Sequence, residues 1–209
     1  MATTRTYNQA CSAAHALDLV GERWALLVVR ELLLGPKRFT DLRAGLPQAS
    51  PNVLTERLRE LETVGVVRRR KLAPPAGSWV YELTGWGLEL ESIMVGLARW
   101  GGRSPRRDLT AAASADALML ALRASVEPGD VAVTCTLRIE GHDFAVRVAD
   151  GRTVIVPGEA TEPDAVIEAD ATTFGALLAG RRLAGITVTG DAAAAESLLA
   201  AIEIPRRIE

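Results

Sequence analysis

One segment of the sequence combines an apolar face with polar side chains whose types suit contacts with nucleic acid. Within residues 51–64, Leu54, Leu58 and Leu61 recur at i, i+4 and i+7, which predicts the buried face of a helix. At about 100° per residue, Asn52, Thr55 and Arg59 fall on the opposite face. Amide, hydroxyl and guanidinium groups can bond base edges and phosphates. Taken alone, the segment favours an ordinary solvated helix surface over a DNA contact.

A cationic ribbon follows this helix directly. The segments VVRRRKL and WVYELT are rich in β-forming residues, and the prolines and glycine of APPAGS predict a turn between them. In a strand, Arg68 and Arg70 point to one side, whereas Arg69 and Lys71 point to the other. A cationic hairpin behind a helix pair is the layout of a winged helix, in which the hairpin meets the DNA backbone or minor groove. The alternative is an edge hairpin kept apart from other chains by its charges.

Several shorter helices must position these side chains. The apolar patterns predict helices in AAHALDLV, in RWALLVVRELLLG and in RFTDLRAGL, with stop signals at Gly35 and Gly45. Ser50 is a suitable N-cap for the next helix, and Pro51 suits its first turn. The predicted DNA-contacting residues are Arg38, Ser50, Asn52, Thr55, Arg57, Arg59, Arg68, Arg69, Arg70 and Lys71.

A second apolar stripe follows the hairpin, in LTGWGLELESIMVGLARWG. Its members recur at alternating spacings of four and three: Trp86, Leu90, Ile93, Leu97 and Trp100. Leu88 and Val95 add a second apolar face. A helix that is apolar on two sides needs more cover than one small domain supplies, so the stripe predicts a homodimer interface. Dimerisation would place two reading helices about one turn of DNA apart. The alternative is that these side chains belong to the hydrophobic core of their own domain.

Charge divides the chain into two parts. Residues 1–107 hold 16 basic and 10 acidic residues, a net charge of +6, whereas residues 108–209 hold 8 and 16, a net charge of −8. The basic part suits a polyanion. Apolar periodicity stops in GGRSPRRDLTAAAS, which predicts a linker. We therefore expect a DNA-binding and dimerisation domain at 1–101, a linker at 102–113 and a second domain at 114–209.

Several function classes are not supported. The sequence contains no Gly-rich phosphate loop, nucleophile elbow or metal-ligand spacing, and His142 and Asp143 would face opposite sides of a strand. We therefore expect no enzyme, no metal and no cofactor. An apolar run of membrane-spanning length and a secretory signal are also missing, which predicts a cytoplasmic protein with no membrane partner.

The first half resembles the HxlR-type branch of the MarR-related winged-helix regulators. The resemblance lies in ALDLVGERWALLVVRELLLGPKRFTDLRAGLP, SPNVLTERLRELETVGVVRR and YELTGWGLEL…LARWG, and spans Cys11 to Gly101. It implies a homodimeric transcription regulator, most often a repressor, that binds a double-stranded DNA operator. It also implies that helix 51–64 reads the groove and that Arg68 to Lys71 lie on the wing.

Cys11 falls where some members of that family carry a redox- or electrophile-sensing cysteine. Members usually have a proline after it, where this chain has Ser12. A sensing thiol needs access to solvent and an electropositive setting. A buried or neutral structural cysteine is the alternative.

The second half resembles sterol-carrier-protein-type lipid-binding domains between Ser114 and Ile204. The resemblance rests on a run of β-like segments followed by the LLAG helix, a strand ending in Gly-Asp and a final helix. It implies an α+β domain with a mainly antiparallel sheet and an apolar tunnel. The predicted lining is Phe144, Phe174, Leu177, Leu178, Leu183 and Ile186, and the alternative for each is ordinary core.

The sequence thus predicts an α+β chain: an N-terminal winged helix-turn-helix, mostly helical with a hairpin wing, and a C-terminal sterol-carrier-like domain. The expected function is a homodimeric repressor whose C-terminal domain binds an apolar metabolite that modulates DNA binding. Alternatively, that domain is ligand-free and serves only assembly, with regulation through Cys11 oxidation or a protein partner.

Overall fold

The computed structural model describes residues 6–108, 111–127, 129–181 and 185–203. The chain divides into two compact units, Met1–Glu91 and Ser92–Glu209. Each unit is described by itself. The domain boundaries expected from the linker composition stay a prediction.

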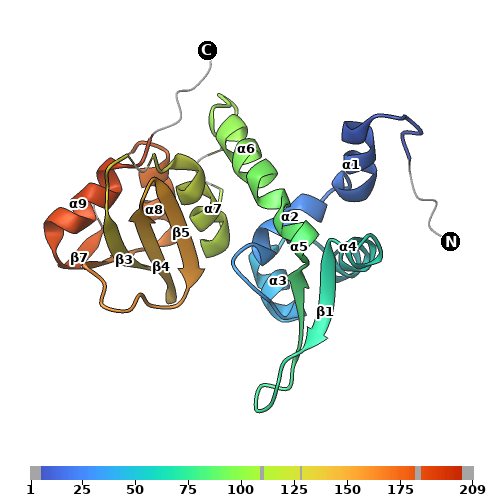
Figure 1. The fold of residues 1–209 in the computed structure, drawn as a ribbon, viewed down its shortest axis with the longest axis horizontal. Helices are drawn as coiled ribbons and strands as arrows, with labels where there is room; N and C mark the ends of the chain where they lie inside the picture. The colour runs from blue at the N-terminus through green and yellow to red at the C-terminus, as the bar shows by residue number, and fades with distance from the viewer. Residues whose placement is uncertain (1–5, 109–110, 128, 182–184, 204–209) are drawn as a thin grey trace. The chain divides into compact units, whose positions relative to one another are not determined.

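The first unit is a winged helix-turn-helix, as the sequence predicted. Its helices are α1 (Ser12–Val20), α2 (Ala25–Leu32), α3 (Phe39–Gly45), α4 (Pro51–Thr63) and α5 (Gly85–Leu88), followed by the start of α6 (Leu90–Gly102). Strands β1 (Val67–Lys71) and β2 (Trp79–Leu83) pair antiparallel and form a hairpin that projects beyond the helices (Figure 1). We call residues 67–83 the wing.

The core of this unit fixes α4 in place. Helix α2 packs against α3, α4 and β2. The leucines predicted to be buried on α4, namely Leu54, Leu58 and Leu61, are at most 1 % exposed. At about 25 cal/mol per Å², burial of such side chains is the main force that holds the helix against the unit. Ser50 caps α4, since its Oγ accepts a hydrogen bond from the Val53 amide at 3.4 Å.

A short bridge ties the base of the wing to the helices. The backbone of Lys37 exchanges hydrogen bonds with that of Tyr81 in β2 at 2.9 and 2.8 Å. The carboxylate of Glu31 in α2 is fully buried, and it pairs with Arg30 at 2.7 Å and with the Lys37 ammonium at 3.3 Å. The bridge and the buried carboxylate, neither of which the sequence predicted, link β2 to α2.

The second unit is an α+β domain built on one mixed sheet. Its helices after α6 are α7 (Ala115–Ser125), α8 (Ala171–Leu178) and α9 (Ala192–Ala200), and its strands are β3 (Val133–Ile139), β4 (His142–Ala149), β5 (Arg152–Pro157), β6 (Ala165–Ala169) and β7 (Thr187–Gly190). The strand order is β5-β4-β3-β6-β7, and only the β3–β6 pair is parallel. This confirms the predicted, mainly antiparallel sheet.

Alternating burial along the strands shows which face of the sheet meets the core. In β4, Phe144, Val146 and Val148 are buried, whereas Arg147 between them is exposed. Helices α7, α8 and α9 lie on the buried face (Figure 1). Strand β5 is at one edge, and Arg123 of α7 donates a hydrogen bond from Nη2 to the Ile155 carbonyl oxygen of that strand at 3.0 Å.

Candidate nucleic-acid interface

The outer face of α4 presents the polar side chains that the helical spacing predicted. Asn52, Thr55 and Arg59 are all exposed. The Thr55 hydroxyl donates to the Pro51 carbonyl at 2.8 Å, which leaves its oxygen able to accept. In the described part of the chain, the Arg59 guanidinium makes no ion pair. This face therefore offers an amide, a hydroxyl and an unpaired cation to a partner.

Arg57 lies on the same helix but in different surroundings. Its side chain is only 9 % exposed, and Nη1 lies 2.7 Å from Glu60 and 3.6 Å from Glu22, with Glu56 3.4 Å from Nη2. Burial raises the pKa of Glu60, although the charge of Arg57 opposes that shift. Because its guanidinium is enclosed by carboxylates, Arg57 joins α4 to the turn before α2. Its predicted DNA contact stays a prediction.

The remaining predicted contacts near α4 lie at helix starts. Arg38 is exposed and stands at the N-cap of α3, where its amide donates to Asp41 at 3.0 Å. Ser50 is exposed at the N-cap of α4. Backbone amides at a helix start favour negative charge, so these positions suit phosphate contacts.

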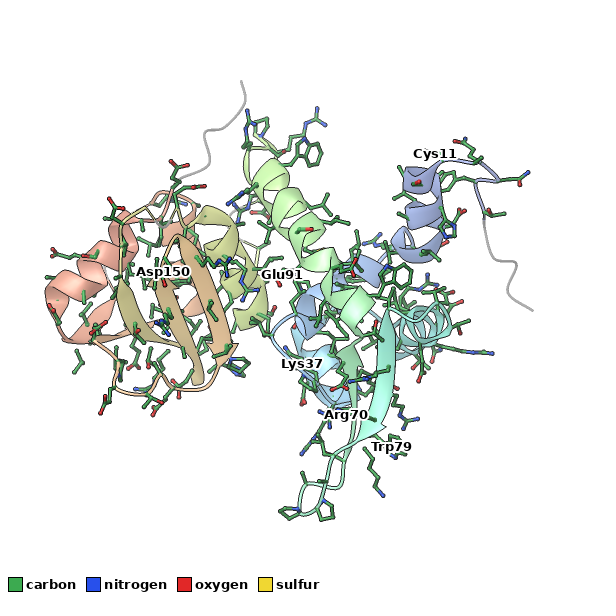
Figure 2. The ribbon with its side chains drawn as sticks, viewed as in Figure 1. Cys11, Lys37, Arg70, Trp79, Glu91 and Asp150 are labelled. Atoms are coloured by element: carbon green, nitrogen blue, oxygen red, sulfur yellow. The ribbon has the colours of Figure 1, made fainter. Side chains whose placement is uncertain are left out.

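The wing carries its four cations in two different settings. Arg68 and Arg70 each donate from Nε to Glu82, at 2.7 and 2.6 Å. Arg69 instead lies over the Trp79 ring at 4.6 Å and near the Tyr81 ring at 5.9 Å. Figure 2 shows Arg70 and Trp79 on the hairpin, away from the helices.

The carboxylate of Glu82 is the buried member of the wing cluster. Its side chain is 11 % exposed, against 65 % for Arg68 and 44 % for Arg70. Burial by itself would raise the pKa of Glu82, but the hydrogen bonds and charges of Arg70 and Arg68 outweigh it and the net shift is downward. Glu82 therefore stays ionised at neutral pH. A cross-strand partner of this kind was not predicted from the sequence.

The predicted dimerisation stripe is largely exposed on α5 and α6. Leu90 is half-buried, and the others are open to solvent: Trp86 (50 %), Ile93 (51 %), Leu97 (42 %) and Trp100 (73 %). Large apolar side chains gathered in this way are typical of an interaction surface. Their role in dimerisation stays a prediction.

Cys11 lies at the N-cap of α1, where Figure 2 labels it. The thiol is exposed, and the backbone N–H groups of Ala14 and Ala13 at the helix start lower the pKa of Cys11. Sequence reasoning found nothing nearby that would do this, because the helix was expected to begin one residue later. Cys135, in contrast, is buried in β3, and burial raises its pKa to about 11.

The residues predicted to line an apolar tunnel belong to the interior of the second unit. Phe144, Phe174 and Leu178 are at most 4 % exposed, whereas Leu177 and Ile186 are half-buried. Leu183 lies outside the described residues. A separate hollow of about 360 Å³ lies on the sheet and is lined by Arg147, Ala149, Asp150, Arg152 and Val154. No predicted lining residue contributes to it, and the tunnel stays a prediction.

The residues that the structure describes contain no group of three or more His, Cys, Asp or Glu side chains able to hold a metal ion. None of their helices is both long and apolar enough to cross a bilayer.

The hairpin, the helix pair and the polar face of α4 define a winged helix-turn-helix transcription regulator that binds DNA. The model of the HxlR-like helix-turn-helix family matches residues 19–108. The chain is 40 % identical over 85 residues to the uncharacterized HTH-type transcriptional regulator YvaP of Bacillus subtilis strain 168, a match that covers 41 % of this chain and 79 % of YvaP. The chain belongs to the HxlR family.

The chain is also similar to other regulators. The HTH-type transcriptional regulator YodB of B. subtilis strain 168 is 35 % identical over 85 residues, covering 41 % of this chain and 76 % of YodB. The reduced form of YodB aligns with 46 % of this chain and 94 % of its own, at 32 % identity and a TM-score of 0.41. The redox regulator HypR in its oxidized form aligns with 47 % of this chain and 99 % of the HypR chain, at 33 % identity and a TM-score of 0.41.

These relatives are transcription regulators and not enzymes, as the sequence predicted. The family match ends at residue 108, and the α+β domain that follows has no family assignment. Its resemblance to sterol-carrier-type domains stays a prediction.

Proposed function

We propose that this protein is a homodimeric repressor that reads an operator with α4, here called the recognition helix, and with the wing. The observation that carries the proposal is the exposed face of α4 with Asn52, Thr55 and Arg59, next to a hairpin rich in arginine. The amide and guanidinium suit base edges in the major groove, and the wing cations suit adjacent phosphates. Arg38 and Ser50 add contacts to the backbone.

The exposed stripe on α5 and α6 supports the homodimer. A second copy that covers Trp86, Ile93, Leu97 and Trp100 would remove large apolar side chains from water, which favours association. A pair of recognition helices would then read two half-sites about one helical turn apart. Native mass spectrometry of the purified chain tests this, with Leu97→Glu as the variant expected to be monomeric.

The operator proposal is tested by DNA capture and sequencing. Fragments retained by the wild-type chain should share a sequence with two-fold symmetry, and fragments retained by an Asn52→Ala, Arg59→Ala variant should lose it. Retention of the same sequence by the variant would refute the role given to the recognition helix. Repression is tested by placing the captured sequence at a reporter promoter, where an increase in expression with added protein would contradict it.

We also propose that the C-terminal unit binds an apolar metabolite. This binding would shift the equilibrium between a dimer geometry that fits the operator and one that does not. Such a shift is limited by the metabolite's differential affinity for the two states. Native mass spectrometry of protein from a crude host extract should show a lipid-sized additional mass on each chain. A dimer without additional mass would favour the alternative, in which this unit serves assembly only.

A second candidate regulation acts through Cys11. Its thiol is exposed and its pKa is lowered by the start of α1, which favours the reactive thiolate. YodB has been crystallised bound to quinone, and HypR is described as a redox regulator. Treatment with diamide should weaken operator binding by the wild-type chain but not by Cys11→Ser. Equal responses of both proteins would exclude this route.

A further inference from the structure

The register of the wing separates its charged side chains onto two faces. Arg68 pairs across the hairpin with Glu82, and Arg70 lies on the same face two residue pairs further along. Arg69 pairs with Tyr81, and Lys71 with Trp79, on the other face. One face therefore holds two cations and a carboxylate, whereas the other holds two cations and two aromatic rings.

The two faces differ in how much charge they present. Both oxygens of Glu82 are used, since Oε1 accepts from Arg68 and Oε2 accepts from Arg70. The group of three side chains thus carries a net charge of one. Because the side chain of Glu82 is only 11 % exposed, water screens these pairs less than it screens pairs at the surface.

The other face keeps its full charge. Neither Arg69 nor Lys71 forms an ion pair within the described part of the chain. The Trp79 ring 4.6 Å from Arg69 orients the guanidinium but, being neutral, leaves its charge uncompensated. Trp79 is itself half-exposed, so the stacked pair is open to a partner.

We propose that Glu82 sets the strength with which the wing binds duplex DNA. Arg69 and Lys71 act as two full cations toward the phosphates, whereas Arg68 and Arg70 together count as one because they share the carboxylate of Glu82. The proposal rests on the proposed function, in which the wing meets the DNA backbone. It adds that an acidic residue within the wing limits the sequence-independent part of the affinity, so that the recognition helix decides between sites.

The salt dependence of DNA binding measures how many cations of the wing act on phosphates, because each contact releases counterions from the DNA. The logarithm of the binding constant falls with the logarithm of salt concentration by about 0.9 for each phosphate that a cation neutralises. Removing the negative charge at residue 82 should therefore steepen the slope by about 0.9. It should also tighten binding to DNA of any sequence.

The test compares three variants of the full chain on a mixed-sequence duplex of about 30 base pairs, which spans about three helical turns. Fluorescence anisotropy is measured from about 50 to 200 mM salt, the range in which one contact changes affinity by about three- to fourfold. Glu82→Gln should steepen the slope by about 0.9. The variant R69A/K71A should flatten it by about 1.8, and R68A/E82Q/R70A should flatten it by about 0.9 or less.

Two results would overturn the proposal. One is a Glu82→Gln protein whose slope and affinity equal those of the wild type. The other is an R68A/E82Q/R70A protein whose slope falls as far as that of R69A/K71A. Circular dichroism and thermal melting check that each variant folds, and Glu82→Ala removes the same charge if the amide disturbs the hairpin. Failure of the wild-type chain to bind any duplex would instead refute the proposed function.

Discussion

The recognition helix and the wing each contain an arginine–glutamate cluster, and the two clusters have opposite arrangements. In α4, one buried guanidinium, that of Arg57, is enclosed by Glu56 and Glu60 of the same helix and by Glu22 of the turn before α2. The side chains of these glutamates are 42–53 % exposed. In the wing, one buried carboxylate, that of Glu82, is held between two exposed arginines. The buried member therefore supports the fold in both places, but the exposed members are acidic in α4 and basic in the wing.

This difference shows that the number of arginines in a segment does not measure the charge offered to DNA. Because exposed carboxylates near Arg57 would repel phosphates, we expect the attraction of the helix for DNA to come from Arg59, Asn52 and Thr55. In the wing the exposed side chains attract phosphates over a range of about one Debye length. We expect the helix to supply specificity and the wing to supply sequence-independent affinity, and the following experiments test that division.

The largest effect is expected where the helix meets the core. Leu58 is 1 % exposed, and Leu58→Ala should lower the free energy of unfolding by about 2–5 kcal/mol because it leaves a cavity. Trp79 in the wing is half-exposed, and Trp79→Ala should change that free energy by less than about 1 kcal/mol. Urea denaturation of both proteins measures the difference. Equal losses would show that the wing, too, is part of the core.

Breaking the cluster of the helix should affect folding more than charge. Arg57→Ala removes a guanidinium bonded to Glu60 and should lower the free energy of unfolding by about 1–3 kcal/mol. The slope of DNA affinity against salt should stay unchanged, because the Arg57 side chain is only 9 % exposed and is paired with carboxylates. Anisotropy titrations at several salt concentrations measure that slope. A decrease by about one would place Arg57 among the phosphate contacts.

Replacement of Arg59 should affect DNA binding more than folding, the reverse of the effect expected for Arg57. Arg59→Ala removes an exposed, unpaired guanidinium, so the free energy of unfolding should change by less than about 0.5 kcal/mol. Operator affinity should fall by about 1–3 kcal/mol, and the preference for operator over mixed sequence should weaken. Competition titrations with both duplexes measure the two quantities. A variant that keeps the parental preference would show that residues other than Arg59 contact the bases.

The smallest effect concerns the two cysteines, which extend the comparison from charge to reactivity. Since the start of α1 lowers the pKa of Cys11, alkylation by iodoacetamide should reach half its maximal rate at a lower pH than for a free thiol. Cys135, buried and with a pKa of about 11, should stay unlabelled in the folded chain. Mass spectrometry after timed labelling measures both sites, with Cys11→Ser as the control. Labelling of Cys135 at a similar rate would contradict the structure.

Much of the fold could be predicted because it follows from local patterns. The spacing of Leu54, Leu58 and Leu61 placed the buried side of α4, and Ser50 with Pro51 placed its start. The strands of the C-terminal unit were predicted from β-rich segments, and the two ends of the wing from APPAGS. These signals depend on residues within one or two turns of each other.

The details of the site depend on residues that are distant in sequence. Glu22 lies 35 residues before Arg57, and no periodicity within α4 indicates that they meet. The pairing of Glu82 with two arginines depends on the hairpin register. The length of the loop sets that register, but the loop length is known only when the residues that end each strand are known. The setting of Cys11 depended on a one-residue difference in where α1 begins.

The bond from Arg123 to the Ile155 carbonyl has a consequence for how the protein behaves when concentrated. Strand β5 is an edge strand with two half-exposed valines, Val154 and Val156, and such edges are templates for aggregation between chains. A carbonyl that already accepts from a guanidinium is a poor partner for the backbone of an incoming strand. We therefore expect the bond from Arg123 to hinder pairing of another chain with β5 at Ile155.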